Sequence, residues 1–133
     1  MAAVSAYLAK AVLDWTLGGA SATQPGARWA GLAVGTPGTN NNAASEMNTL
    51  TGYSRITALF GAANSPAGSA SITAVMSFGP FSSVGSALGC HLWDGSPVGS
   101  SSMLLEGTLQ TGRTFIPGDI LVFSAGALTI TLT

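Results

Sequence analysis

The sequence of 133 residues is long enough to bury a hydrophobic core of its own, and its four basic and five acidic side chains leave a net charge of −1. Charged residues make up 7% of the chain, against about 25% in an ordinary soluble domain. Four scattered cations cannot form the clustered basic surface that a phosphate backbone requires, which argues against nucleic-acid binding. So weakly charged a surface gives little repulsion between copies and favours a subunit of an assembly; a Gly- and Ser-rich monomer is the alternative.

The first predicted element is a helix over residues 5–17, which Gly18 closes because glycine suits the left-handed position just past a helix end. Apolar side chains cover almost its whole circumference, and the polar strip consists of Lys10 and Asp14. We expect one face to close an end of the chain's own sheets, namely the face of Val4, Tyr7, Leu8, Ala11, Val12 and Trp15. Another subunit is expected to cover the opposite face, which holds Ala6, Ala9, Leu13 and Leu17.

The N-terminal apolar stretch is interrupted by Lys10 and Asp14, so we expect no signal peptide. No apolar run approaches the ~20 residues of a membrane span. The single Cys90 excludes an internal disulfide and leaves the redox compartment open. The sequence therefore predicts neither a membrane partner nor a disulfide framework.

After residue 17 the apolar pattern changes from helical to alternating, in short runs separated by Gly, Pro, Ser and Asn. Strands are predicted near 28–35, 53–60, 70–78, 87–94, 102–110, 120–124 and 127–133. The polar segment 36–45 is predicted to be an exposed loop. The expected fold is mostly β, an antiparallel β-sandwich or jelly-roll-like arrangement with one N-terminal α-helix. We expect 1–133 to form a single domain, with the helix and its cap in 1–19 and the sandwich in 28–133.

Two turns are predicted from the backbone conformations that their own proline and glycine residues favour. Pro117 presets φ and Gly118 supplies the positive φ of a type II turn before the strand at 120–124. Gly126 is expected to let that strand fold back into 127–133, so that the last strand is the second arm of a hairpin. The residues of this arm expected to be buried are Leu128, Ile130 and Leu132.

The adjacent Cys90 and His91, three residues before Asp94, suggest a nucleophile with its base and orienting acid. Strand alternation argues against that interpretation, because neighbouring side chains point to opposite faces. It is expected to place Leu88, Cys90 and Leu92 inside and His91 and Trp93 outside. Asp94 begins a turn and is expected to bond turn amides.

No other catalytic or metal-binding pattern is found. The five carboxylates are dispersed at Asp14, Glu46, Asp94, Glu106 and Asp119, and no metal-ligand spacing or phosphate-binding loop occurs. We therefore expect no enzymatic activity, no cofactor and no metal. Three tryptophans, Trp15, Trp29 and Trp93, could form a sugar-stacking platform, although packing in a core or an interface is the more common use of aromatic side chains.

Five segments carry a pattern in chain order: YLAKAVLDWTLGG, RWAGLAVGTPG, SEMNTLTGYSRITALFGAAN, GCHLWDG and LLEGTLQTGRTFIPGDILVFSAGALTITLT. This pattern, from Tyr7 to Thr133, resembles the small phage structural proteins usually labelled tail-fibre proteins. Their pattern begins with a helix ending LLDxxLGG, continues with GxYxR before a TFGAA-like stretch, and closes on GDxLxFxAGALTxTL. Here GLAVG and TALFGAAN depart from the commoner aromatic-rich strand and VTFGAA.

The resemblance implies a non-enzymatic virion structural protein, assembled in the bacterial host cytoplasm, whose partners are capsid or tail proteins and copies of itself. It would decorate and cement the capsid or sit on the tail or fibre base; the alternative is a receptor- or glycan-binding module of the tail. Low charge and a helix that is apolar on both sides agree with a homo-oligomeric subunit. The candidate interface residues are Ala6, Leu13, Leu17 and Trp93.

Overall fold

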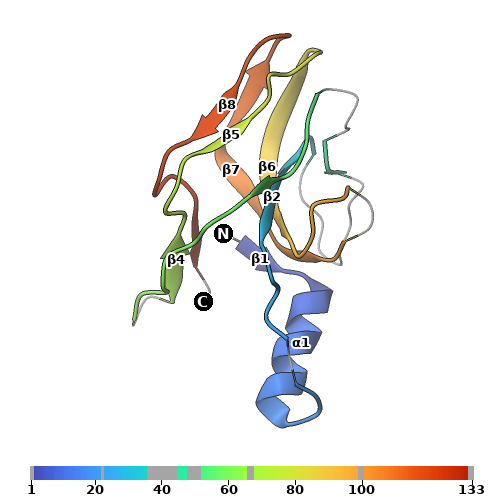
Figure 1. Ribbon diagram of the computed structural model, residues 1–133, viewed down its shortest axis with the longest axis vertical. Helices are drawn as coiled ribbons and strands as arrows, with labels where there is room; N and C mark the ends of the chain where they lie inside the picture. Colours follow the sequence, from blue (N-terminus) through green and yellow to red (C-terminus); the bar gives the residue numbers. More distant parts are fainter. Residues whose placement is uncertain are drawn as a thin grey trace.

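The computed structural model describes residues 2–21, 23–35, 45–47, 52–65, 68–98 and 101–131. These residues form one helix at the N-terminus and a set of antiparallel strands, which confirms the predicted mostly-β fold class (Figure 1). The elements are β1 (Ala2–Val4), α1 (Ala6–Leu17), β2 (Trp29–Ala33), β3 (Ile56–Thr57), β4 (Ser69–Ser71), β5 (Met76–Phe78), β6 (Gly85–Trp93), β7 (Met103–Phe115), β8 (Leu121–Phe123) and β9 (Thr129–Thr131).

The largest sheet has the strand order β1-β7-β6-β2-β3, and each neighbouring pair in it is antiparallel. Its centre is the pair of long strands β6 and β7. Two smaller sheets, β4-β9 and β5-β8, form a second layer beside it (Figure 1). The predicted loop at 36–45 lies outside the described residues except for Ser45, whose carbonyl accepts a hydrogen bond from Val34 N at 2.8 Å.

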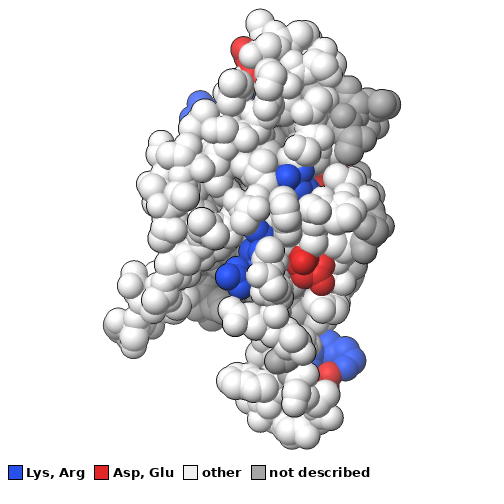
Figure 2. All heavy atoms as spheres, in the orientation of Figure 1, with Lys and Arg blue, Asp and Glu red and all other residues white. Residues whose placement is uncertain are grey.

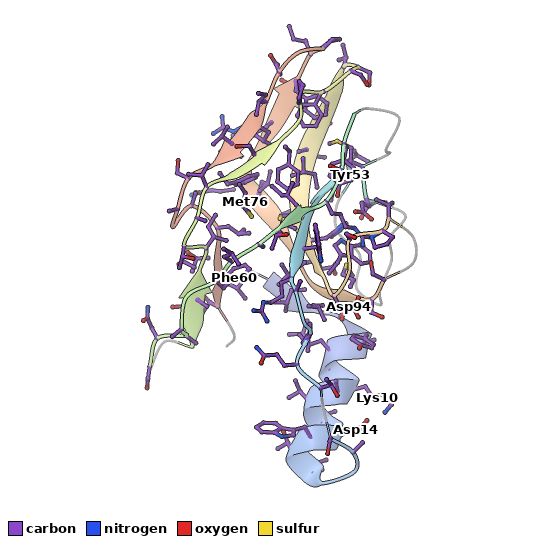
Figure 3. All side chains as sticks on the ribbon, viewed as in Figure 1. Lys10, Asp14, Tyr53, Phe60, Met76 and Asp94 are labelled. Carbon is purple, nitrogen blue, oxygen red and sulfur yellow. The ribbon has the colours of Figure 1, made fainter. Side chains whose placement is uncertain are left out.

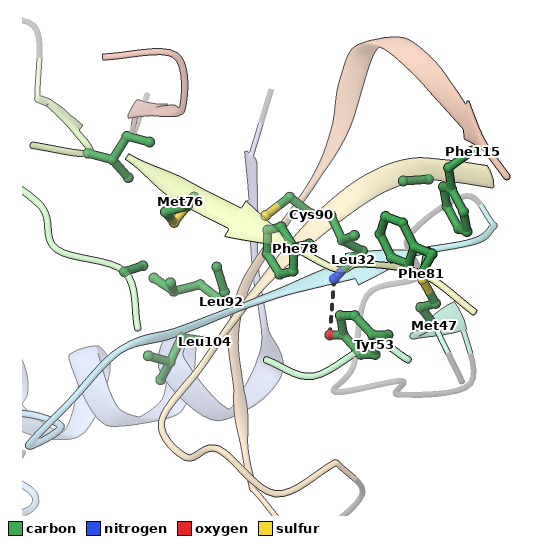
Figure 4. Close-up of a cluster of buried hydrophobic side chains, with 14 residues drawn as sticks. Leu32, Met47, Tyr53, Met76, Phe78, Phe81, Cys90, Leu92, Leu104 and Phe115 are labelled. Atoms are coloured by element: carbon green, nitrogen blue, oxygen red, sulfur yellow. Dashed lines mark hydrogen bonds between the residues drawn. The ribbon is translucent and has the colours of Figure 1, made fainter. Parts of the chain in front are cut away.

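The hydrophobic core lies between the two layers and contains buried side chains of β2, β6 and β7 and of β5 (Figure 4). Leu121 and Phe123 of β8 are partly buried against it. Aromatic rings form much of it. Phe78 stacks on Tyr53 with ring centroids 6.1 Å apart and meets the edge of Phe123 at 6.0 Å. Phe81 and Phe115 stack at 3.8 Å. These rings join segments that are far apart in the sequence.

The predicted strand at 70–78 is wrong as a single element. It divides into β4, which pairs with β9, and β5, which pairs with β8. Between them Thr73 N donates to Leu59 O at 2.8 Å, which redirects the chain. Ile72 and Met76 are both buried, so apolar alternation continues across the break and the sequence pattern does not reveal it. Strand β1 was not predicted.

The predicted C-terminal hairpin is also wrong. Gly126 does have a positive φ of 81°, and Ala127 N donates to Ser124 O at 2.9 Å. However, β8 pairs with β5 and β9 pairs with β4, so this turn passes the chain from one small sheet to the other. Leu128 and Ile130 are half-buried against the core, and Leu132 lies outside the described residues.

The predicted turn at Pro117 and Gly118 is present. Gly118 has a φ of 94°, and Asp119 N donates to Ile116 O at 3.1 Å, which closes the turn as expected of type II. Asp119 contributes further, because its carboxylate accepts a hydrogen bond from Ile116 N at 3.0 Å. This turn was predictable because its geometry depends on neighbouring residues alone.

Helix α1 begins and ends as predicted but does not pack as predicted. Ser5 caps its start, accepting from Leu8 N at 3.1 Å, and Gly18 ends it with a φ of 76°. None of its twelve residues, all of them described, is buried. Trp15, expected to cover the chain's own sheets, is 67% exposed. Beyond its first turn the helix runs away from the sheets (Figure 1), so the sheets do not cover it.

Candidate functional site

His91 and Trp93 are buried, contrary to the outward orientation that strand alternation predicts. Each is 1% exposed. They lie on the second face of β6, where Ser45 contacts His91 and Arg55 contacts Trp93. From Gly89 to Trp93 both faces of this strand are therefore inside the molecule. Leu88, expected inside, is 41% exposed because a register shift between Ala87 and Gly89 turns it outward. Trp93 therefore offers almost no surface to another subunit.

A buried ion pair is the centre of the covered face. Arg55 Nε donates to Glu46 Oε1 at 2.6 Å, and its Nη2 donates to Oε2 at 2.7 Å, while the two side chains are 0% and 1% exposed. Tyr53 hydroxyl donates to Glu46 Oε1 at 2.8 Å and accepts from Leu32 N at 3.1 Å. Burial, and then the Glu46 carboxylate, raises the pKa of Tyr53 well above its usual value, so the phenol stays a donor.

Arg55 also fixes the turn that follows β6. Its Nη1 donates to the carbonyls of Gly95 and Pro97, both at 2.9 Å, and to Ser101 Oγ. Its guanidinium carbon lies 3.7 Å from the centroid of the Trp93 ring, a cation–π contact. Asp94, marked in Figure 3, accepts from Ser102 N at 2.7 Å. Its carboxylate therefore bonds a backbone amide, as expected, but one at the far end of the loop between β6 and β7 and not one of the turn at 95–97.

His91 completes this cluster as a neutral ring. Its Nε2 lies 3.3 Å from Ser45 Oγ, and the ring meets the Trp93 ring edge-on at 5.7 Å. Burial lowers the pKa of His91, and this effect outweighs the attraction of the Glu46 carboxylate. Three buried polar atoms of the described chain have no protein partner: His91 Nδ1, Trp93 Nε1 and Glu106 Oε2. We name Glu46, Tyr53, Arg55, His91 and Trp93 the buried polar cluster.

The arrangement does not assemble a nucleophile. Cys90 points into the apolar core, where burial raises its pKa to about 12, so its thiol is protonated at neutral pH. His91 lies on the other face of the strand, as alternation requires. In the described part of the chain, no group of three or more His, Cys, Asp or Glu residues could hold a metal ion. The hydrogen bonds and ring contacts of the cluster join residues 45–46, residues 53–55, β6 and the turn after β6.

Gly31, in β2, lies directly against three side chains of the buried polar cluster. A Cβ there would lie 2.6 Å from Tyr53 hydroxyl oxygen, 2.9 Å from Glu46 Oε1 and 3.1 Å from Trp93 Nε1. We expect Gly31→Ala to lower the free energy of unfolding by about 1–3 kcal/mol, because three buried groups must shift. Gly26→Ala is the matched control: its Cβ would meet nothing within 4 Å. Urea denaturation of both variants tests this, and equal stability would contradict the crowding.

The ion pair was missed at the level of sequence because its members are nine residues apart and share no pattern with β6. The spacing of the five carboxylates does not indicate this site, because Glu46 pairs with a cation and not with another carboxylate. One signal was available. Tyr53 and Arg55 are the tyrosine and arginine of the GxYxR segment, in which the glycine here is Gly52, directly before Tyr53. Both side chains contact the same carboxylate.

The remaining candidate residues lie on α1. Leu13 is 57% exposed, Leu17 is 78% exposed, and Ala6 is exposed as well. The ion pair of Lys10 and Asp14, labelled in Figure 3, lies along the same helix. Charged atoms are few on the face that Figure 2 shows, and most of that face is uncharged. Within the described residues, no helix has both the length and the apolar character needed to cross a bilayer.

A tryptophan platform for sugars is not formed by the described residues. Trp93 is buried in the polar cluster and Trp29 is half-buried, whereas Trp15 is exposed on α1. Trp29 and Trp93 are paired across β2 and β6, so their positions belong to the sheet. Trp15 is thus the one tryptophan of the three that presents most of its surface.

One protein family matches nearly the whole length of the chain. The family described as podophage GP4 fiber I protein gp80 matches residues 3–131. No curated protein matches the chain. The match includes α1, the buried polar cluster and the closing strands β8 and β9. The chain therefore belongs to the podophage GP4 fiber I protein gp80 family and is a phage tail-fibre-type structural protein.

Proposed function

We propose that the chain is a non-enzymatic structural subunit of the phage tail or fibre, attached to copies of itself and to other virion proteins through α1. The observation that carries the proposal is the exposure of this helix: Leu13, Trp15 and Leu17 are 57%, 67% and 78% exposed. An isolated helix of twelve residues is marginal in water, and helices in proteins are stabilised chiefly by burying an apolar face. A partner that covers α1 would supply this burial.

Hydrogen bonds fix both ends of α1, so the helix is ordered although its apolar side chains are exposed. Ser5 N donates to Leu104 O at 3.0 Å, and Ser5 Oγ donates to Met103 O at 2.5 Å, so the first turn is fastened to β7. Gly19 N donates to Asp14 O at 2.8 Å and closes the last turn. These bonds hold the first and last turns of α1 in place, while the apolar side chains between them stay exposed. This supports a surface built for association.

Leu13→Asp is expected to leave the fold intact and to abolish self-association and incorporation into particles. The side chain is largely exposed in the single chain, whereas a carboxylate without a partner in an apolar contact is costly. Thermal unfolding and sedimentation separate the two effects. Gln24→Asp, which adds the same charge at an exposed site outside the helix, is the control. A Leu13→Asp variant that assembles like wild type would refute the proposal.

The location on the particle is tested by copy number. We expect the band of this protein in purified virions to correspond to a few or a dozen copies, as for a tail or fibre component. A capsid-decorating cement protein would instead be present in hundreds of copies. Quantification against the major capsid protein decides between them, and the family membership is what favours the tail or fibre.

A further inference from the structure

Glu106 and His91 lie opposite each other in the central pair of strands, and both are buried. The register of β6 and β7 pairs the two residues directly and is regular from Gly89 to Leu92. Glu106 is 3% exposed and His91 is 1% exposed. Side chains of directly opposed residues lie on the same face of a sheet, with Cβ atoms about 4.5–5.5 Å apart. The carboxyl and the ring are therefore neighbours inside the molecule.

Each of these two side chains has a buried polar atom without a partner. Within the described residues, His91 Nδ1 and Glu106 Oε2 make no hydrogen bond. The residues beside them in the same row of the sheet are Ala3 of β1 and Gly31 of β2, which carry no polar side chain. A buried polar atom without a hydrogen bond is costly. Glu106 and His91 are thus the side chains in this row that can satisfy each other.

Glu106 also has no cation to neutralise it. All four cations of the chain lie in its described part, and none of them forms an ion pair with Glu106. Two pair with other carboxylates, one donates to a carbonyl and one is exposed on β7: Lys10 with Asp14, Arg55 with Glu46, Arg28 with Pro25 O, and Arg113. The titratable groups that face His91 from residues 45–47 and 53–55 are bonded to one another, namely Glu46, Tyr53 and Arg55. An ionised Glu106 would therefore be a buried charge without a counter-charge, which is unfavourable.

We infer that Glu106 and His91 form a neutral hydrogen-bonded pair across β6 and β7, in which the protonated carboxyl donates to His91 Nδ1 directly or through one water. The ring then carries its hydrogen on Nε2, which donates to Ser45 Oγ at 3.3 Å. Both ring nitrogens are satisfied in this tautomer. Burial acts in the same direction, because it raises the pKa of Glu106 and lowers the pKa of His91.

The pair predicts a pH dependence of stability with two opposite parts. The stabilising effect of a protonated Glu106 is complete below pH 4.5, the ordinary pKa of a glutamate, and is lost as the pH rises through the higher pKa in the folded chain. The effect of a neutral His91 is complete above pH 6.5, the ordinary pKa of a histidine, and is lost as the pH falls towards the lower folded pKa. Each part changes the folding equilibrium constant by up to about tenfold per pH unit.

Urea denaturation of Glu106→Gln, His91→Gln and wild type from about pH 4 to about pH 8 measures both parts, because glutamine does not titrate in this range. Relative to wild type, the folding constant of Glu106→Gln should rise about tenfold or more between about pH 5 and about pH 8. That of His91→Gln should rise about tenfold or more between about pH 7 and about pH 4. Asp14→Asn removes an exposed carboxylate and is the control, with a ratio to wild type that stays within about twofold.

Nitrogen-15 NMR reads the hydrogen bond itself, because His91 is the one histidine of the chain. Wild type at neutral pH should show a ring with hydrogen on Nε2 and none on Nδ1. Glu106→Leu keeps a side chain of similar size at the buried position but cannot donate, so the Nδ1 resonance should move or the tautomer should change. This measurement needs no denaturation, so it holds even if His91→Gln does not fold.

The outcomes test the two halves of the pair separately. A folding constant of Glu106→Gln that keeps a fixed ratio to wild type across the pH range would mean that the carboxyl is already ionised in the folded chain, and would overturn the inference. A ring with hydrogen on Nδ1 in wild type, or an Nδ1 resonance that Glu106→Leu leaves in place, would show that Glu106 does not donate to His91 and would overturn it as well. Neither result depends on how α1 associates.

Discussion

Replacing Arg55 with methionine is expected to lower the free energy of unfolding by about 3–5 kcal/mol, because it leaves the Glu46 carboxylate buried without its cation. The loss includes the bonds from Arg55 to the carbonyls of Gly95 and Pro97, which fix the turn after β6. Urea denaturation at neutral pH measures it. Asp14→Asn is the control, since an exposed pair four residues apart in a helix contributes about 0.3–0.5 kcal/mol.

A second variant separates the charge from the packing. In the double variant Glu46→Leu with Arg55→Met, no unpaired charge is left, so part of the lost stability should return. The return should be incomplete because Tyr53 loses its acceptor, Glu46 Oε1. A single Arg55→Met variant that loses less than about 1 kcal/mol would mean that water or another group already neutralises the carboxylate.

Phe78→Ala is expected to cost about 3–5 kcal/mol, the range for truncating a buried aromatic residue. The ring is 1% exposed and lies between Tyr53, drawn with it in Figure 4, and Phe123 of β8. Val122→Ala is the matched control on the paired strand β8, because Val122 is 52% exposed. We expect its effect to stay within about 0.5 kcal/mol.

Chemical denaturation of the two variants checks the comparison. Loss of the Phe78 ring should lower the denaturation midpoint, whereas the slope should stay unchanged if the same surface is exposed on unfolding. Equal midpoints for Phe78→Ala and Val122→Ala would show that the two layers do not depend on this ring. They would also contradict the placement of the core between the sheets.

The features predicted correctly from the sequence depend on a few neighbouring residues. The end of α1 at Gly18 and the turn at Pro117 and Gly118 follow from backbone conformations that these residues favour. The pairing of strands cannot be predicted from neighbouring residues in this way. The sequence around Gly126 specifies a turn, but whether the next strand pairs with β8 or with β4 depends on Ser69–Ser71, which lie 58 to 62 positions away.

The covered face of β6 shows a second feature that could not be predicted from the sequence. Alternation predicts that Cys90 and His91 face opposite ways, and they do. It does not tell whether the second face meets water or another segment of the chain. Glu46 and Arg55 decide this, and their pairing across nine residues has no periodicity by which to recognise it. The candidate helix residues were recognisable because an apolar circumference is a property of one segment.

The fastening of Ser5 to β7 determines where a force applied to α1 would act. A pull on the helix reaches β7 directly through the two Ser5 hydrogen bonds and then spreads over the ladders to β6 and β2. The helix cannot swivel freely about its first residue, because rotation would break the bonds from Ser5 to Leu104 and Met103. Tension on a fibre would thus load the central strands of each subunit rather than stretch a linker.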